Sequence, residues 1–272
     1  MFKCAMLNFR KWGSCYRIYI VIASVLVFTY IRTDSIREYA KEIGMAVTPY
    51  FFPFQFSDGT TSMLFYFALV LLLCNAPFTD NQQIFVVLRT GRRKWFAGQI
   101  LYVFLANICF FLVVAIASIV LFFPWVGIST SWGSIFTVMA ENPQLSGIFM
   151  DSSVIYQYQP FTACGITFGM NILVGTLYGL VIFYGNMFGS RVFGPAVAVS
   201  WIVLSNIIEI TGLHELYYIS PLNWGNPDIF IGTETDVTYT YAIIFLLSGI
   251  VLLSVLILRK SKKYTIEAME EI

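Results

Sequence analysis

Six apolar stretches constrain this chain more than any other feature of its sequence. A helix that crosses the hydrocarbon core of a bilayer needs about 20 mostly apolar residues. The last four stretches reach that length, and we expect the short first two to continue into flanking polar residues. The predicted spans are 16–31, 61–76, 97–123, 163–188, 193–213 and 239–258.

The composition agrees with a membrane protein. Hydrophobic residues make up 58% of the chain and charged residues 11%, whereas a soluble domain is about 25% charged. A soluble fold of 272 residues could not bury this much apolar side chain, but lipid can solvate it. We therefore predict an all-α, multi-pass protein of the cell (inner) membrane with one transmembrane domain over 1–272. Its net charge of +1 gives no reason to expect a nucleic-acid partner.

The placement of lysine and arginine predicts the orientation of the spans, because cytoplasmic loops are enriched in these residues. Thirteen of the 16 lie before or at the very start of the first span, between the second and third, between the fourth and fifth, or after the sixth. The other three are Arg32, Arg37 and Lys41, and loops 124–162 and 214–238 contain none. We expect both termini in the cytoplasm and therefore an even number of spans, six.

The residues before the first span predict an amphipathic helix in the cytoplasmic interface. Its apolar residues recur at helical spacing, at Phe2, Met6, Phe9 and Trp12. A disordered basic tail is the alternative. The end of the first span, 28–31, offers no small-residue cleavage site, so we read the span as a retained helix rather than a cleaved signal peptide.

Two loops on the predicted outer side are rich in aromatic residues. They cover 50–56 and 217–224. Aromatic rings favour the headgroup layer, which suggests re-entrant or interfacial segments. Packing of the loops onto one another explains the composition equally well.

The sequence lacks the usual signatures of catalysis and cofactor binding. His214 is the one histidine, and we interpret it as interfacial. No HExxH, phosphate-binding loop or Cys/His cluster with metal-ligand spacing occurs. An odd number of cysteines without paired spacing is no disulfide framework. We expect no catalytic residue, metal or cofactor on this chain, so that any ATP and Mg²⁺ would be bound by another polypeptide.

Four of the polar residues within predicted spans stand out, because strongly polar side chains are costly in lipid and often have a function there. They are Asn107, Asn171, Asn206 and Glu209. One interpretation is a polar strip that lines a pathway. The other is hydrogen bonding between helices, with Glu209 reaching the outer surface. The glycines between 165 and 179 predict tight helix packing in the fourth span.

The connection between the second and third spans predicts a short helix across the cytoplasmic face. Pro77 ends the second span, Thr79 or Asp80 can cap the new helix, and Gly91 can terminate it. Apolar residues at helical spacing (Ile84, Val87 and Leu88) form a stripe that favours a protein partner. A helix on the membrane surface without a partner is the alternative.

With this short helix, the six-span pattern resembles the permease subunits of type-2 ABC exporters. The matching residues are Ala76-Pro77, the run from Arg89 to Lys94, and Ala97-Gly98-Gln99, with a weaker match at 218–224. Where that family carries acidic residues in the helix, this chain has Asn81-Gln82-Gln83.

The resemblance implies a coupling helix that docks on a separate ATP-binding subunit. The coupling residues would be Gln83, Ile84, Phe85, Val87, Leu88 and Arg89. Two permease copies, or two related permeases, would enclose one pathway through the lipid. Composition suggests an amphipathic substrate such as a peptide, lipid-like molecule or drug. The rival functions are an integral-membrane lipid-modifying enzyme and a non-transporting sensor or immunity protein.

Overall fold

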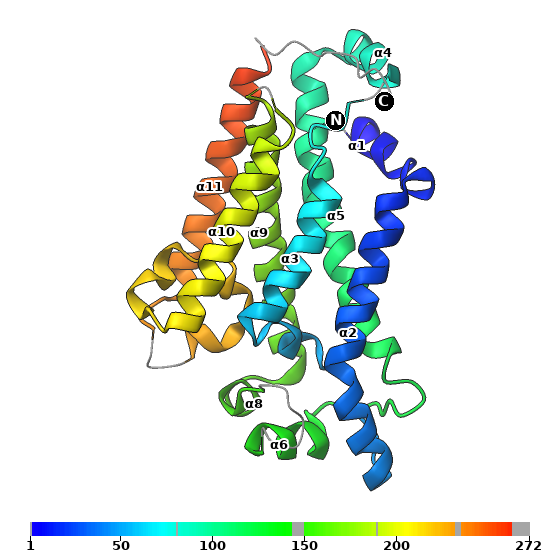
Figure 1. Cartoon of the computed structure of the whole chain (residues 1–272), viewed down its shortest axis with the longest axis vertical. Helices are drawn as coiled ribbons and strands as arrows, with labels where there is room; N and C mark the ends of the chain where they lie inside the picture. The colour runs from blue at the N-terminus through cyan, green and yellow to red at the C-terminus, as the bar shows by residue number, and fades with distance from the viewer. Residues whose placement is uncertain (1, 80, 143–149, 189, 232–234, 263–272) are drawn as a thin grey trace.

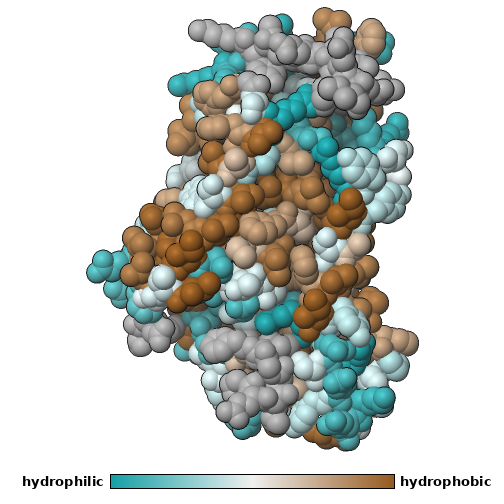
Figure 2. Space-filling model, viewed as in Figure 1, coloured by the Kyte–Doolittle hydropathy of each residue, from teal (hydrophilic) through white to brown (hydrophobic). Residues whose placement is uncertain are grey.

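The structure is a computed structural model that describes residues 2–79, 81–142, 150–188, 190–231 and 235–262. For residues 81–84 it describes the backbone alone. Long helices run alongside one another through the molecule (Figure 1). Apolar residues cover much of the middle of the visible face, and hydrophilic residues gather toward its two ends (Figure 2).

Within the described residues, five helices are long and apolar enough to cross a membrane, in agreement with a multi-pass helical membrane protein. A sixth apolar helix, α3 (Gly59–Leu73), has 15 residues and is about 22 Å long, shorter than the ~30 Å hydrocarbon core. The five long helices are α2 (Tyr16–Ile43), α5 (Arg92–Val120), α9 (Pro160–Asn186), α10 (Phe193–Thr211) and α11 (Tyr239–Lys260).

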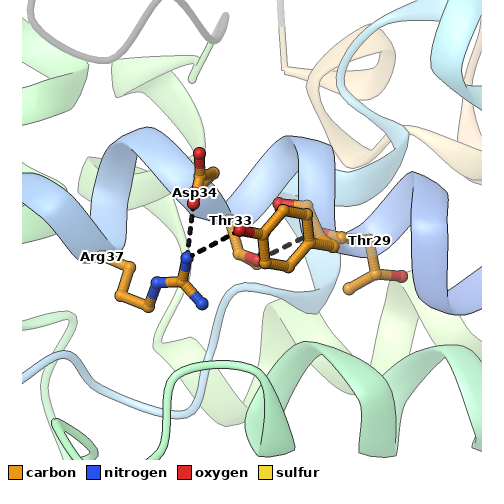
Figure 3. Close-up of polar contacts among 5 residues, drawn as sticks. Thr29, Thr33, Asp34 and Arg37 are labelled. Atoms are coloured by element: carbon orange, nitrogen blue, oxygen red, sulfur yellow. Dashed lines mark hydrogen bonds and ion pairs between the residues drawn. The ribbon is translucent and has the colours of Figure 1, made fainter.

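Helix α2 runs twelve residues beyond the apolar stretch 16–31 that predicts it. In the polar half, Ile36 and Ala40 are fully buried in apolar contacts, and one ion pair at i,i+3 spacing adds to the stability of the helix. Arg37 lies 2.5 Å from the carboxylate of Asp34 and donates to the hydroxyl of Tyr30 at 3.1 Å (Figure 3). Gly44, at φ 70°, ends the helix in the left-handed conformation that glycine adopts easily.

Helix α9 lies at the centre of the bundle, in contact with α3, α5, α10 and α11. Glycine allows this close packing. A Cβ atom at Gly179 would lie 2.6 Å from Val103 of α5, and one at Gly185 would lie 2.6 Å from the Cα of Gly194 in α10. Tight packing of the fourth predicted span is therefore present in the structure.

The N-terminal helix α1 (Phe2–Phe9) packs against α5. Asn8 donates a hydrogen bond to Gln99 at 2.9 Å, and the indole of Trp12 donates to the hydroxyl of Tyr102 at 2.8 Å. Phe2 and Met6 are exposed. The predicted apolar stripe is thus divided, because Phe9 and Trp12 pack on the protein while its first two residues face outward.

The aromatic side chains of both loops pack largely against other parts of the protein. Around η2 (Phe52–Phe56), α6 (Gly133–Glu141) and α8 (Ser152–Gln157) a second apolar core forms at the end of the bundle away from α1 (Figure 1). Phe54 lies 5.2 Å from Trp132 between ring centroids. In the other loop, the buried Trp224 donates to the carbonyl of Tyr217 at 2.9 Å. The loop 50–56 thus packs on the residues of another loop, as one interpretation expects, and placement of either loop in the headgroup layer stays a prediction.

Candidate functional site

The helix α4 (Asn81–Thr90) lies beyond the start of α5, at the same end of the bundle as α1 and the end of α11 (Figure 1). Arg92 donates to the carbonyl of Lys262 at 3.4 Å, which places the ends of α5 and α11 together. Gly91, at φ 82°, donates its backbone N–H to Val87 at 2.8 Å. The predicted end of the short helix at Gly91 is therefore confirmed. Asp80, one of the two predicted caps, lies outside the described residues.

The apolar side chains of α4 do not all face one way. Val87 is 7% exposed, whereas Phe85 is 74% and Leu88 78% exposed. Residues three apart share a helix face, so Phe85 and Leu88 present one apolar patch, which we call the α4 patch. Of the predicted stripe, Val87 packs on the protein, whereas Leu88, which points about 100° away from it on the helix, is exposed; docking of these residues on a partner stays a prediction. The side chains of Gln83 and Ile84 lie outside what the structure describes.

The base of α4 is fixed by a contact that the sequence analysis missed. The side-chain amide of Asn186, at the end of α9, donates to the carbonyls of Cys74 and Ala76 at 2.8 and 2.6 Å. Its oxygen accepts from the backbone N–H of Gly194 at 3.0 Å. A single asparagine thus joins the end of α9, the start of α10 and the segment that leads into α4.

A second tie links the same parts of the chain. Arg191, in the turn between α9 and α10, donates to the hydroxyl of Thr79 at 2.7 Å. The sequence gives no sign of these contacts, because single polar residues such as Asn186 and Arg191 are common at the ends of spans. The tertiary fold alone brings residues 74–79 next to 186–194.

The predicted intramembrane asparagines lie at helix contacts. Asn107 of α5 is fully buried and donates to the carbonyl of Val103 at 2.8 Å, and its side-chain oxygen abuts Gly175 of α9. Asn171 of α9 accepts from the hydroxyl of Tyr66 in α3 at 2.9 Å. It also donates to the carbonyl of Gly225 at 3.1 Å. Asn171 therefore ties α9 to α3 and to the loop at η4 (Asn223–Gly225).

The other two predicted residues meet the start of α3. Glu209 of α10 accepts from the backbone N–H of Gly59 at 2.7 Å. The side-chain oxygen of Asn206 lies 2.9 Å from the position of a Cβ atom at Gly59. Asp58 caps the same helix end by accepting from the backbone N–H of Thr61 at 2.9 Å.

The four residues are thus divided among three contacts within one chain, and three of them meet α3 through Tyr66 or Gly59. One of the two interpretations was hydrogen bonding between helices. Asn171 makes such a bond to the side chain of Tyr66, and Glu209 makes one to the backbone N–H of Gly59. Lining of a pathway, which would form between two chains, stays a prediction.

The remaining reactive side chains show no cluster within the described residues. His214 is exposed and stacks over Tyr217 with ring centroids 6.0 Å apart, and all five cysteines are free. No group of three His, Cys, Asp or Glu that could hold a metal ion occurs in this part of the chain. Compared with family models, curated proteins and solved structures, the chain matches none of them.

Proposed function

We propose that this chain is the membrane-spanning subunit of an ATP-driven exporter of the type-2 ABC class. In this proposal the protein lies in the inner membrane, and α3 crosses that membrane as a sixth span. Both termini and α4 lie on the cytoplasmic side. The observation that carries the proposal is the α4 patch, two large apolar side chains exposed on a helix outside the bundle.

The distribution of charge supports this orientation. Basic side chains of the described residues gather at the α4 end, on α1, at the starts of α2 and α5, in the turn after α9 and at the end of α11. Basic residues favour the cytoplasmic side. The opposite end carries acidic residues, including Glu38, Glu141 and Asp228.

A protein partner explains the α4 patch better than lipid does. Arg92, Arg93 and Lys94 are exposed at the start of α5, and such a cluster anchors a helix at the inner headgroups. Because α4 lies beyond the start of α5 (Figure 1), we place it on the aqueous side of this anchor. Leaving Phe85 and Leu88 in water forgoes about 1.5–3 kcal/mol for each side chain, which a docked subunit would recover.

The mechanism follows from how α4 is held. An ATP-binding subunit that carries ATP and Mg²⁺ would dock on Phe85, Leu88 and the adjacent Arg89. Since the base of α4 is tied to Asn186 and Arg191, a displacement of α4 would move the α9–α10 turn with it. A packed contact with two arrangements can transmit such a motion. Two copies of this chain, or one with a related permease, would enclose a pathway for an amphipathic substrate.

The decisive experiment is copurification. The tagged chain is coexpressed with an ABC-type ATPase from the same genome, chosen where such a gene neighbours its own, and purified in mild detergent. The proposal expects a stoichiometric complex whose ATP hydrolysis rises after reconstitution in lipid with an amphipathic peptide or lipid-like substrate. A chain that purifies in folded form without any ATPase contradicts the proposal.

A further inference from the structure

An open groove of about 780 Å³ lies between the start of α5 and the end of α11, and we call it the α5–α11 groove. The two helix ends meet at the α4 end of the bundle, where Arg92 donates to the carbonyl of Lys262 (Figure 1). For comparison, an engineered protein cavity of about 150 Å³ holds a benzene molecule, so the groove has room for a larger group. The residues that line it are Arg93, Lys94, Ala97, Val255, Leu258, Arg259 and Lys262.

The face of α11 that borders the groove changes from apolar to basic along the helix. Val251, Val255, Leu258 and Lys262 follow one another at steps of four, three and four residues, so they lie on one side of the helix. Val251 is 61% exposed and continues this face beyond the groove, toward the middle of the bundle. An apolar surface thus leads from the middle of α11 to the basic side chains at its end.

The other side of the groove is a helix N-terminus with basic residues. The first turn of α5 contains Arg92, Arg93 and Lys94 and no acidic residue. A helix N-terminus carries a partial positive charge and favours anions, so bases in this turn do not stabilise the helix. Gly91, the residue before α5, has no side chain that could cap the first N–H groups. An anion in the groove would be attracted by the bases and by the helix end together.

The four basic side chains of the groove have donors to offer. All four are exposed, and within the described residues none of these side chains makes a hydrogen bond or an ion pair. Like charges that share one groove repel one another, and a bound anion would offset that repulsion. Two of the four are arginines, whose planar fork of N–H groups matches the oxygens of a phosphate. The four are Arg93, Lys94, Arg259 and Lys262.

We propose that the α5–α11 groove binds an anionic phospholipid, with the phosphate at the four bases and an acyl chain along the apolar face of α11. Basic pockets between membrane helices are suited to such headgroups. A free phosphate or an acidic protein surface would use the bases, but neither would gain from the apolar face that leads to Val251. The site is independent of the docking of an ATPase on α4.

The test uses the full chain without an ATPase, purified in detergent and stripped of lipid. Native mass spectrometry measures retention of phosphatidylglycerol, which has a net negative charge, and separately of zwitterionic phosphatidylcholine. We expect phosphatidylglycerol to be retained at least about tenfold more strongly, since each base near a membrane surface contributes about fivefold to the binding of anionic lipid. Equal retention of the two lipids overturns the proposal.

Variants separate the groove from general surface charge. Lys94→Gln with Arg259→Gln removes one base from each helix and should reduce retention of phosphatidylglycerol by at least about tenfold. Lys94→Arg with Arg259→Lys keeps both charges and should keep most of the binding. The matched control is Lys3→Gln with Arg10→Gln, which removes the same charge from exposed residues at the same end of the bundle. An equal loss in this control contradicts a site in the groove.

Other occupants of the groove would give different results. Inorganic phosphate in large excess should leave phosphatidylglycerol bound, and full displacement of the lipid would assign the groove to a free anion. The same Lys94→Gln, Arg259→Gln variant is also coexpressed with the ATPase. Loss of the ATPase with unchanged retention of phosphatidylglycerol would assign the groove to a protein contact and overturn the proposal.

Two further variants complete the experiment. Glu267, Glu270 and Glu271 follow α11 in the sequence but lie outside the described residues, so all three are replaced together by glutamine. Retention of phosphatidylglycerol within about threefold of wild type supports the proposal, and a larger rise would assign the groove to the acidic tail instead. If the double glutamine variant fails to fold, Lys262→Gln is measured in its place. We then expect a loss of about fivefold, and unchanged retention overturns the proposal.

Discussion

The carboxylate of Glu209 accepts a hydrogen bond of 2.7 Å from the backbone N–H of Gly59. This contact joins α10 to the first residue of α3, where backbone N–H groups have no partner within the helix. Because a helix N-terminus favours negative charge, an acidic residue on the neighbouring helix is well placed there. The contact gives the one acidic side chain of α10 a structural role.

Replacing Glu209 should therefore weaken the attachment of α3. We expect Glu209→Ala to lower the free energy of unfolding by about 1.5–3 kcal/mol, the range for a hydrogen bond to a charged group. Glu209→Gln keeps an acceptor oxygen and should cost less than half as much. The thermal midpoint of the detergent-purified chain measures both, and equal shifts for the two variants would contradict this role.

Two glycines of α9 offer a matched test of the close approach between α9 and α5. A Cβ atom at Gly175 would lie 3.0 Å from Leu69 and from Phe111 and would collide with Asn107, whereas one at Gly169 meets nothing within 4 Å. Gly175→Ala should destabilise the chain by about 1–3 kcal/mol. Gly169→Ala should be neutral or slightly stabilising, because alanine favours a helix. Comparable midpoints for both variants would show that α5 and α9 do not approach in this way.

Asn186 should control the order of the segment that leads into α4. Asn186→Ala leaves the carbonyls of Cys74 and Ala76 and the N–H of Gly194 without their partner, and each buried polar group left unpaired costs about 1–3 kcal/mol. We expect faster hydrogen exchange in residues 74–79 and 193–196 and little change in α6. The control is Asn142→Ala, since exposed Asn142 bonds within its own helix end. Unchanged exchange in residues 74–79 would rule out the tie.

The α4 patch should decide whether an ATPase assembles with the chain. Leu88→Asp places a charge in the proposed docking contact, and we expect a loss of at least about 90% of copurified ATPase with normal insertion in the membrane. Ile128→Asp is the matched control, because Ile128 is a fully exposed apolar residue in the segment after α5, at the other end of the bundle. A normal yield of ATPase with Leu88→Asp would exclude α4 as the coupling helix.

Much of the fold can be predicted from the order of apolar and basic residues. Predicted starts and ends of the later spans agree with the structure within a few residues, as for 193–213 and α10 (Phe193–Thr211). Such agreement is expected, because lipid forces every backbone group of a span into helical hydrogen bonds. The first span continues into polar residues as expected, and its extension to Ile43 packs Ile36 and Ala40 into the second apolar core, a tertiary contact that hydropathy does not register.

The contacts around α4 could be predicted less well from the sequence. The stripe on α4 was predicted from helical spacing, but the packing of Val87 determines which face of the helix stays exposed, and that face carries Phe85 and Leu88. Asn186 carried no signal, because its three partners lie up to 112 residues away.

By itself, the sequence indicated the helical membrane class, the apolar helices and the separation of most basic residues from the outer loops, since these depend on local composition and on the bilayer as solvent. Only the tertiary structure decided what the polar residues do. It placed Glu209 against Gly59, Asn186 beneath α4, and the bases of α5 and α11 around one groove. These contacts join residues far apart in the chain, and the close packing that selects them depends on all the helices together.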